Sequence, residues 1–166
     1  MKNLSRKQLK NKLDRVFSLF IRIRDCNDKG IVVCPLCGKK MRWNDLVCQC
    51  MHFVKRFILK YRYAEENCYA GCSGCNVFLN WNYQQYTLFM IKKFGLEKVE
   101  NMLNDKQIYK VHDYELEEMI VIYTQKTIEL AKKKGIDITK YFTKKVLTSY
   151  WYYGNSKQET KWIKSV

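Results

Sequence analysis

Two Cys-x-x-Cys pairs constrain the fold of this chain more than any other feature of its sequence. Cys34 and Cys37 form the first pair, and Cys72 and Cys75 form the second. Such a turn delivers two thiolates to one ion, so two pairs complete the tetrahedral set that zinc prefers. The 34 residues between the pairs exceed the roughly 15–20 of an ordinary paired site, which predicts an inserted hairpin. A closed four-thiolate site leaves no position for water, so this zinc is predicted to be structural.

The alternative for these four residues is a set of buried thiols without metal. We expect a cytoplasmic protein, because the N-terminus lacks a signal-peptide pattern and no apolar run approaches the roughly 20 residues of a membrane span. Cytoplasmic thiols are more often metal ligands than disulfides. The other four cysteines have no partner at this spacing and are interpreted as packing residues: Cys26, Cys48, Cys50 and Cys68.

The charge of the chain favours a nucleic-acid partner. Its 166 residues suit one compact domain with extensions, and 31 Lys and Arg against 16 Asp and Glu give a net charge of +15. Such an excess attracts an anionic partner, and nucleic acid is favoured over a membrane. A basic surface without a specific partner is the alternative. Residues 100–131 are acidic, so one surface is not expected to face nucleic acid.

The hydrophobic pattern predicts a mixed chain with more helix than strand. Apolar spacings of three and four predict helices at 5–25 with Ser5 as N-cap, at 75–94, at 96–103, and from a capping Asp113 to Gly135. Short β-rich or apolar segments predict extended structure at 30–33, 46–54 and 67–70. The predicted order is therefore strand, long connection, strand and helix, and the two Cys-x-x-Cys turns (knuckles) lie at its ends.

Three polar residues inside this frame are candidates for catalysis. His52, one of two histidines, ends an apolar segment, as a general base on a strand would. Asn67 could hydrogen-bond His52 and fix its tautomer. Asn76 directly follows a cysteine of the second pair and could offer its amide oxygen to a hard cation. Base and cation together are what phosphodiester hydrolysis needs, although a single histidine is more often structural.

Several stretches resemble the phage NinG (Rap) recombination endonucleases, members of the HNH or His-Me finger superfamily with a zinc frame like that of endonuclease VII. In chain order these are a helix at 13–25, the knuckle at 34–38, Gln49-Cys-Met-His52-Phe53, Asn67, Cys72-Ser-Gly-Cys75-Asn76, and a helix end at Lys92-Lys93-Phe94-Gly95. The resemblance covers about residues 10–105, leaving the last third unexplained.

The resemblance implies an α+β, mostly helical fold with a zinc-stabilised ββα-metal core between an N-terminal helix and C-terminal helices. We expect two domains: residues 1–105, with the N-terminal helix and the zinc-containing nuclease core, and residues 106–166, a helical, basic and aromatic extension. The resemblance further implies His52 as general base, Asn67 as its positioner and Asn76 as a ligand of catalytic Mg²⁺ or Mn²⁺. The expected substrate is branched or recombination-intermediate DNA of a phage.

One position departs from many His-Me nucleases. They carry an Asp before the base that binds the cation, whereas this chain has Met51, a poor ligand for a hard ion. The sequence leaves the second oxygen ligand open among Asp45, Gln49, Glu65 and Glu66. Met51 also motivates the alternative function, a catalytically impaired zinc-containing DNA-binding protein that keeps the fold. A protein-interaction module explains the charge less well.

Basic and aromatic residues alternate between His52 and Asn67, which suits phosphate contacts and base stacking. The predicted contacts to nucleic acid are Lys55, Arg56, Lys60 and Arg62. A solvated loop is the alternative. The lysines and aromatic residues after 136 could extend a DNA surface or form a homodimer contact, and the sequence leaves both open. His112 is assigned a capping or surface role.

Overall fold

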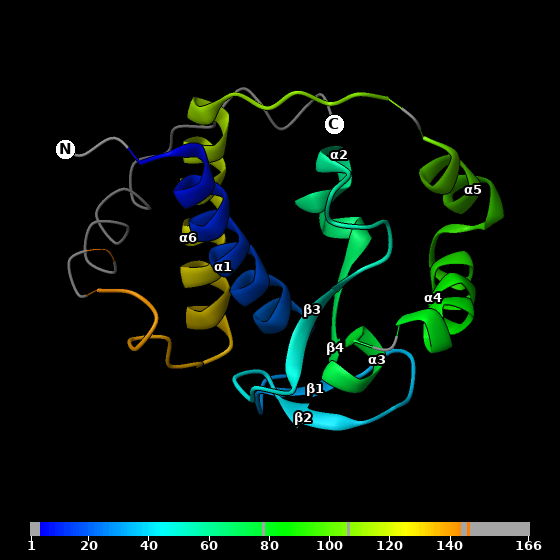
Figure 1. Cartoon of the computed structure of the whole chain (residues 1–166). Helices are drawn as coiled ribbons and strands as arrows, with labels where there is room; N and C mark the ends of the chain where they lie inside the picture. Colours follow the sequence, from blue (N-terminus) through cyan, green and yellow to red (C-terminus); the bar gives the residue numbers. More distant parts are fainter. Residues whose placement is uncertain (1–3, 78, 106, 144–145, 147–166) are drawn as a thin grey trace. The chain divides into compact units, whose positions relative to one another are not determined.

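The computed structural model describes residues 4–77, 79–105, 107–143 and 146 of the chain. Contacts define a compact unit that runs to Ile136, so it extends beyond the sequence-based boundary at 105. Everything below concerns this unit (Figure 1). Most of the basic and aromatic tail lies outside the described residues.

Helices make up most of the unit, and four short strands form two hairpins. The helices are α1 (Arg6–Asp25), α2 (Leu59–Arg62), α3 (Ser73–Val77), α4 (Leu79–Phe94), α5 (Leu96–Asn104) and α6 (Asp113–Lys133), with a 3-10 turn at Glu65–Asn67. The strands are β1 (Ile31–Val33), β2 (Lys40–Arg42), β3 (Cys48–His52) and β4 (Cys68–Cys72). The fold is therefore mixed α and β with small antiparallel sheets, as predicted.

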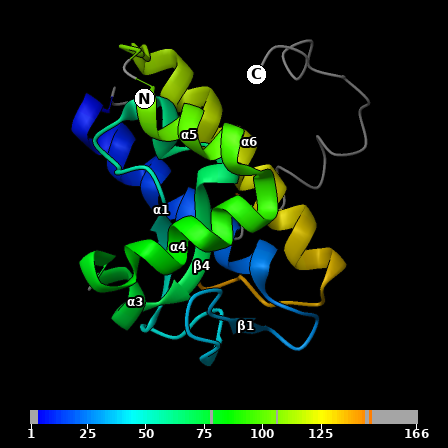
Figure 2. The same ribbon diagram turned by 90° about the vertical axis from the view of Figure 1, so that its right-hand side faces the viewer.

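The N-terminal helix α1 is defined by its cap and its apolar stripe. Ser5 caps it as predicted: the Ser5 hydroxyl accepts from the Gln8 N–H, and the Gln8 side chain accepts from the Ser5 N–H. Its apolar side chains are buried, and α1 packs along α6 (Figures 1 and 2). Phe17 meets the ring of Tyr123 edge-on at 4.8 Å between centroids, which anchors this helix pair.

The C-terminal end of α1 holds the strand β4. The Asp25 carboxylate accepts from the Ala70 N–H at 2.7 Å. The Arg24 guanidinium donates to the Cys68 carbonyl at 2.7 Å and to the Glu65 carbonyl at 2.9 Å. The last carbonyls of α1 accept from the ammonium group of Lys134, just beyond α6. These charged hydrogen bonds to backbone groups fix the sheet against the helix pair.

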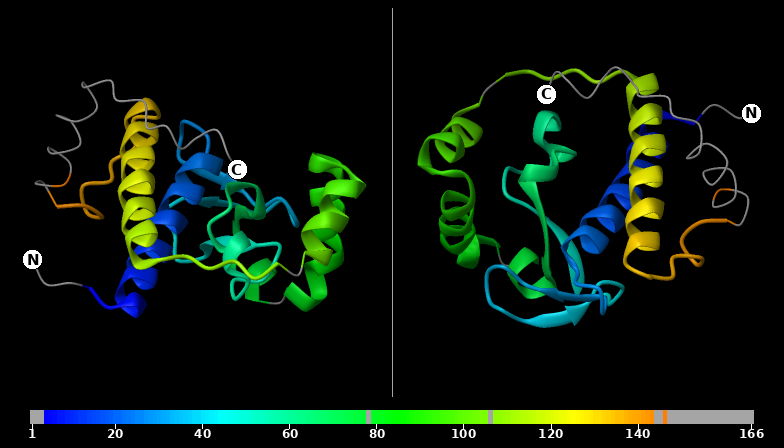
Figure 3. Two further views of the ribbon diagram at one scale, coloured as in Figure 1. Left: turned by 90° about the horizontal axis from the view of Figure 1, so that it is seen from above. Right: turned by 180° about the vertical axis from the view of Figure 1, so that it is seen from behind.

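The cysteine spacing predicted one hairpin between the two pairs, and β3 and β4 form it; the strand β2, and with it the β1–β2 hairpin, was not predicted. Strands β1 and β2 pair with Val32 opposite Met41, and β3 and β4 pair with Cys50 opposite Ala70 and His52 opposite Cys68. The β3–β4 hairpin lies between α1 on one side and α4 on the other (Figures 1 and 3). Alternate residues of β3 therefore meet different helices.

The later helices follow the predicted order with two differences. The predicted helix 75–94 begins earlier, at Ser73, and is described as α3 and α4, with residue 78 between them outside the described residues. Gly95 follows α4 with φ 86°, a conformation that favours glycine. The N-cap of α6 is His112 and not Asp113, since Asp113 is already helical. The His112 N–H donates to a Glu115 carboxylate oxygen at 2.5 Å, which confirms the capping role of this histidine.

None of the helices in the described part of the chain has the length and apolar character that crossing a membrane requires.

We expect α6 to be part of one cooperative unit with α1. Leu116 is fully buried in α6, so Leu116→Ala should lower the free energy of unfolding by about 2–5 kcal/mol, through lost burial and the cavity that it leaves. Val121 is half exposed on the same helix, and Val121→Ala should change it by less than about 0.5 kcal/mol. Urea unfolding monitored by circular dichroism measures both. A Leu116→Ala variant as stable as the Val121→Ala control would contradict the assignment of α6 to this unit.

Candidate functional site

The four cysteines of the two pairs meet at one point. Cys34 and Cys37 lie in the turn between β1 and β2, whereas Cys72 ends β4 and Cys75 lies in α3. Their four sulfur atoms all lie within 4.8 Å of one another, and Cys37 Sγ is 3.6 Å from Cys72 Sγ. Zinc–sulfur bonds of about 2.3 Å in a tetrahedron place sulfurs a little under 4 Å apart. The cluster therefore fits a zinc ion.

Local hydrogen bonds shape this cluster for thiolates. The first turn is closed by the Cys34 N–H, which donates to the Lys39 carbonyl at 2.8 Å. The Cys75 N–H points at Cys72 Sγ at 3.4 Å, and the Asn82 amide donates to Cys75 Sγ at 3.0 Å. Burial opposes ionisation of Cys34, but nearby backbone N–H groups outweigh it and lower the pKa of this thiol to about 7. The predicted ligand set thus forms a possible zinc-binding site.

The two faces of β3 carry different chemistry. Gln49 and Met51 face α3 and α4, where the Tyr86 hydroxyl donates to the Met51 carbonyl. Cys50 and His52 face α1 and line a pocket with residues of that helix. The period of two along a strand places residues 49 and 52 on opposite faces.

His52 is half-buried at the end of β3. Its Nε2 lies 3.0 Å from the Arg62 carbonyl oxygen. A carbonyl only accepts, so this bond requires Nε2–H and leaves the lone pair of a neutral ring on Nδ1. Burial lowers the pKa of His52 to about 4, and the positive charges of Arg56 and Arg62 act in the same direction. The ring is therefore neutral, with one basic nitrogen, across the physiological range.

Asn67 has a different role from the predicted hydrogen bond to His52. Its side chain is fully buried and bonds to backbone instead: Oδ1 accepts from the Val54 N–H at 2.7 Å, and Nδ2 donates to the carbonyls of Val54 and Tyr61. These bonds fix both ends of the connection that follows His52. Its influence on His52 is therefore indirect, through the position of the backbone that carries the Arg62 carbonyl.

Asn76 lies beside Gln49, one of the four residues that the sequence left open as a second oxygen ligand. The Asn76 amide donates to Gln49 Oε1 at 2.6 Å and leaves its own Oδ1 available. The three acidic candidates have other partners: Asp45 accepts from the Arg42 N–H, Glu65 pairs with Lys126, and Glu66 pairs with Lys98.

Met51 is fully buried, in close contact with Gly71. A Cβ at Gly71 would lie 2.3 Å from the Met51 methyl carbon, so glycine is required there to accommodate this side chain. The residue directly before His52 is thus a packing residue.

The basic residues predicted to contact nucleic acid differ in exposure and in their partners. Lys55, Arg56 and Lys60 are exposed, whereas Arg62 is half-buried. Lys60 pairs with Asp105 at 2.5 Å, and Arg62 forms a two-pronged ion pair with Asp14 at 2.6 and 3.0 Å. Arg62 is therefore mainly structural, because the pair ties the connection after His52 to α1.

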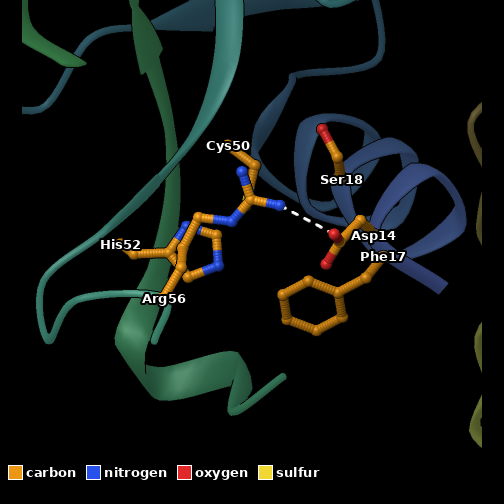
Figure 4. A pocket seen from close by; sticks show the side chains of 6 residues that line it. All are labelled: Asp14, Phe17, Ser18, Cys50, His52 and Arg56. Carbon is orange, nitrogen blue, oxygen red and sulfur yellow. Dashed lines mark ion pairs between the residues drawn. The ribbon is translucent and has the colours of Figure 1, made fainter. Parts of the chain in front are cut away.

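A small pocket of about 70 Å³ lies between His52 and α1 (Figure 4). Its lining residues are Asp14, Phe17, Ser18, Cys50, His52 and Arg56. Arg56 reaches across it to Asp14 at 2.8 Å. Burial opposes ionisation of Asp14, but the hydrogen bond from Arg62 and the two arginine charges outweigh it and lower the pKa of this carboxyl. The pocket thus combines a neutral base, an anion and an exposed cation.

Three residues near His52 were not among the predicted site residues. The sequence places Asp14 only within the N-terminal helix and predicts Cys50 and Cys68 to be packing residues. In the structure, Sγ of Cys50, Sγ of Cys68 and a ring nitrogen of His52 lie within 4.8 Å of one another. The spacing of two between Cys50 and His52 was a signal in the sequence, whereas the pairing of His52 with Cys68 depends on the strand register.

The fold and site define a mixed α and β protein with a four-cysteine site and a histidine-bearing hairpin. The chain belongs to the family described as bacteriophage lambda NinG protein, whose family model matches residues 1–134. The match includes both cysteine pairs, His52, Asn67 and Asn76, and it extends through α6. Among curated proteins and among solved structures, no match was found.

We expect removal of metal from the four-cysteine site to unfold the core. Two-stranded hairpins are only marginally stable without a cross-link such as a bound metal ion. The free energy of metal binding at a structural site therefore contributes directly to the stability of the folded state. A strong chelator should lower the unfolding temperature, and Cys72→Ser should reproduce the effect without chelator. Cys26→Ser, at a buried cysteine outside the cluster, should still respond to chelator as the wild type does. Differential scanning calorimetry with metal analysis measures this. A wild type whose unfolding ignores the chelator would contradict a structural zinc.

We expect His52 to titrate near pH 4 with its proton on Nε2 above that pH. An unfolded histidine titrates near 6.5, so between pH 6.5 and 4 only the unfolded state takes up the proton. The free energy of unfolding should therefore fall by about 3 kcal/mol as the pH falls from 6.5 to 4 and should not depend on this group above pH 6.5. Long-range ¹H–¹⁵N spectra of the imidazole report both pKa and tautomer, and a His112→Gln variant assigns the signals. A midpoint at or above 6.5 would contradict the burial described for this ring.

Proposed function

We propose that this protein is a metal-dependent DNA endonuclease of the HNH type, acting on branched or recombination-intermediate DNA of a phage. One observation carries the proposal: β3 ends in a neutral, oriented His52 beside a pocket, and its partner strand β4 leads directly into α3, the helix that bears Asn76. A hairpin followed by a helix is the order expected of a ββα-metal core. Membership of the NinG family agrees with a role in a phage.

His52 supplies the general base in this proposal. Its Nε2–H stays bonded to the Arg62 carbonyl while Nδ1 accepts a proton from a water that attacks the scissile phosphate. The low pKa of His52 keeps the ring unprotonated at neutral pH. Asn67 acts through the backbone, because its three buried hydrogen bonds hold both ends of the connection that carries this carbonyl.

Asn76 holds the cation in this proposal. Its Nδ2 is bonded to Gln49, which orients the amide and leaves Oδ1 as the ligand atom. Bound Mg²⁺ or Mn²⁺ would supply charge stabilisation to the scissile phosphate. Asn76 and Gln49 offer the donor chemistry that such hard ions prefer, and Gln49 is the candidate for a second oxygen.

The substrate class rests on charge and on the position of the basic residues. The chain carries +15, and Lys55 and Arg56 are exposed directly after the base. Arg56 lies beside the pocket, where an exchange of Asp14 for a DNA phosphate would place the backbone next to His52. Branched DNA is the substrate that the family resemblance implies.

A DNA-binding protein without cleavage is the second candidate, and Met51 favours it. This side chain is fully buried and offers no oxygen, so the cation keeps few protein ligands. The two candidates share the fold and the basic surface and differ only in the chemistry at the hairpin.

Cleavage assays separate the two functions. The wild type should cut a four-way junction, a flap or linear duplex in Mg²⁺ or Mn²⁺, and His52→Ala should reduce the rate by at least about 100-fold, the contribution of a general base. Asn76→Ala should raise the Mn²⁺ concentration needed for half-maximal rate, whereas Asn101→Ala, at an exposed residue of α5, should not. Single-strand substrates complete the set.

Two outcomes decide against the endonuclease. Binding without cleavage by the wild type in either metal supports the DNA-binding alternative. Cleavage that persists in a folded His52→Ala variant rules out His52 as the base and assigns the activity elsewhere. Retained unfolding cooperativity and zinc content serve as the folding control for each variant.

A further inference from the structure

We propose that Cys50, His52 and Cys68 form a second metal site, for a thiophilic divalent ion such as Zn²⁺. The three side chains come from facing strands of one hairpin: His52 pairs directly with Cys68, and Cys50 lies two residues before His52 on the same face. Their ligand atoms lie within 4.8 Å of one another, the same limit that the four-cysteine cluster meets. The two sites share no residue.

The chemistry of the trio matches zinc. Thiolate and imidazole are the ligands that zinc accepts most readily, and a Cys₂His set with a water as fourth ligand is a known form of zinc site. The ring of His52 can offer Nδ1 to a metal while Nε2–H keeps its bond to the Arg62 carbonyl. A backbone acceptor on the second nitrogen is the usual support of a metal-binding histidine.

The surroundings provide an open fourth position. Cys50 and His52 line the pocket next to α1, which is large enough for a water. Arg56 lies on the rim of this pocket. Burial raises the pKa of the Cys68 thiol, so a metal ion that binds here has to displace its proton. Cys68 is fully buried, so the metal is reached from the Cys50 side. Three protein ligands should hold zinc less tightly than the four of the structural site.

Zinc in this site would take the lone pair that the proposed hydrolysis needs. Zinc would therefore inhibit cleavage, an effect that rests on the proposed function. Zinc binding to the three residues does not depend on the proposed function.

Co²⁺ titration of the full-length, metal-free protein under reducing conditions tests the proposal. The wild type should bind two equivalents: the first with the charge-transfer band of four thiolates, the second with a band about half as strong, because only two thiolates contribute. Cys50→Ser should keep the first equivalent and weaken the second by more than about 100-fold, beyond the usual effect of losing a supporting residue.

Cys48→Ser is the matched control, since Cys48 lies on the same face of β3, is buried and belongs to neither cluster. It should bind two equivalents. Binding of the first equivalent of Co²⁺ shows that a variant folds, so a variant that loses only the second equivalent has lost the second site specifically. Saturation of the wild type at one equivalent, or two undiminished equivalents in Cys50→Ser, would overturn the proposal.

Discussion

The rest of the site depends on one contact, the cluster of four cysteine side chains that joins the β1–β2 turn to the β4–α3 junction. Two-stranded hairpins bury little apolar surface and are marginal alone. Here the cluster joins the first hairpin to the second at the residue where β4 becomes helical. That junction also sets the start of α3, which carries Asn76 next to Cys75. The clamp therefore positions the candidate cation ligand as well as the strands.

A second constraint comes from the end of α1. Arg24 and Asp25 bond to backbone groups of β4, while Arg62 ties the connection after His52 to Asp14 on α1. The connection after His52 and the helix α1 together form the environment of this ring. The carbonyl of Arg62 selects the tautomer of His52, and side chains of α1 line the pocket beside it. One helix thus controls burial, charge and access at the proposed base.

The two faces of β3 separate two kinds of metal chemistry. The amide groups of Gln49 and Asn76 lie on the side of α3, and amide oxygens are ligands that hard cations prefer. Sulfur and nitrogen ligands lie on the side of α1, where a softer ion fits. His52 belongs to the second face, although the proposed reaction needs it to act on a phosphate held by the first. His52 also lies opposite Cys68, at the end of the hairpin away from the junction of Cys72 with α3, so the proposed substrate would have to reach both ends of β3.

The sequence by itself determined the local elements and the four-cysteine ligand set, because helical periodicity, caps and Cys-x-x-Cys spacing are local signals. It predicted α1 with its Ser5 cap, a hairpin between the two cysteine pairs, and the four cysteines of the possible zinc site. Only the tertiary structure decided that Asn67 bonds to backbone and not to His52, that α6 packs on α1, and that Cys68 meets Cys50 and His52. These depend on strand register and on which helix covers which face, and both are set by packing between residues far apart in the chain.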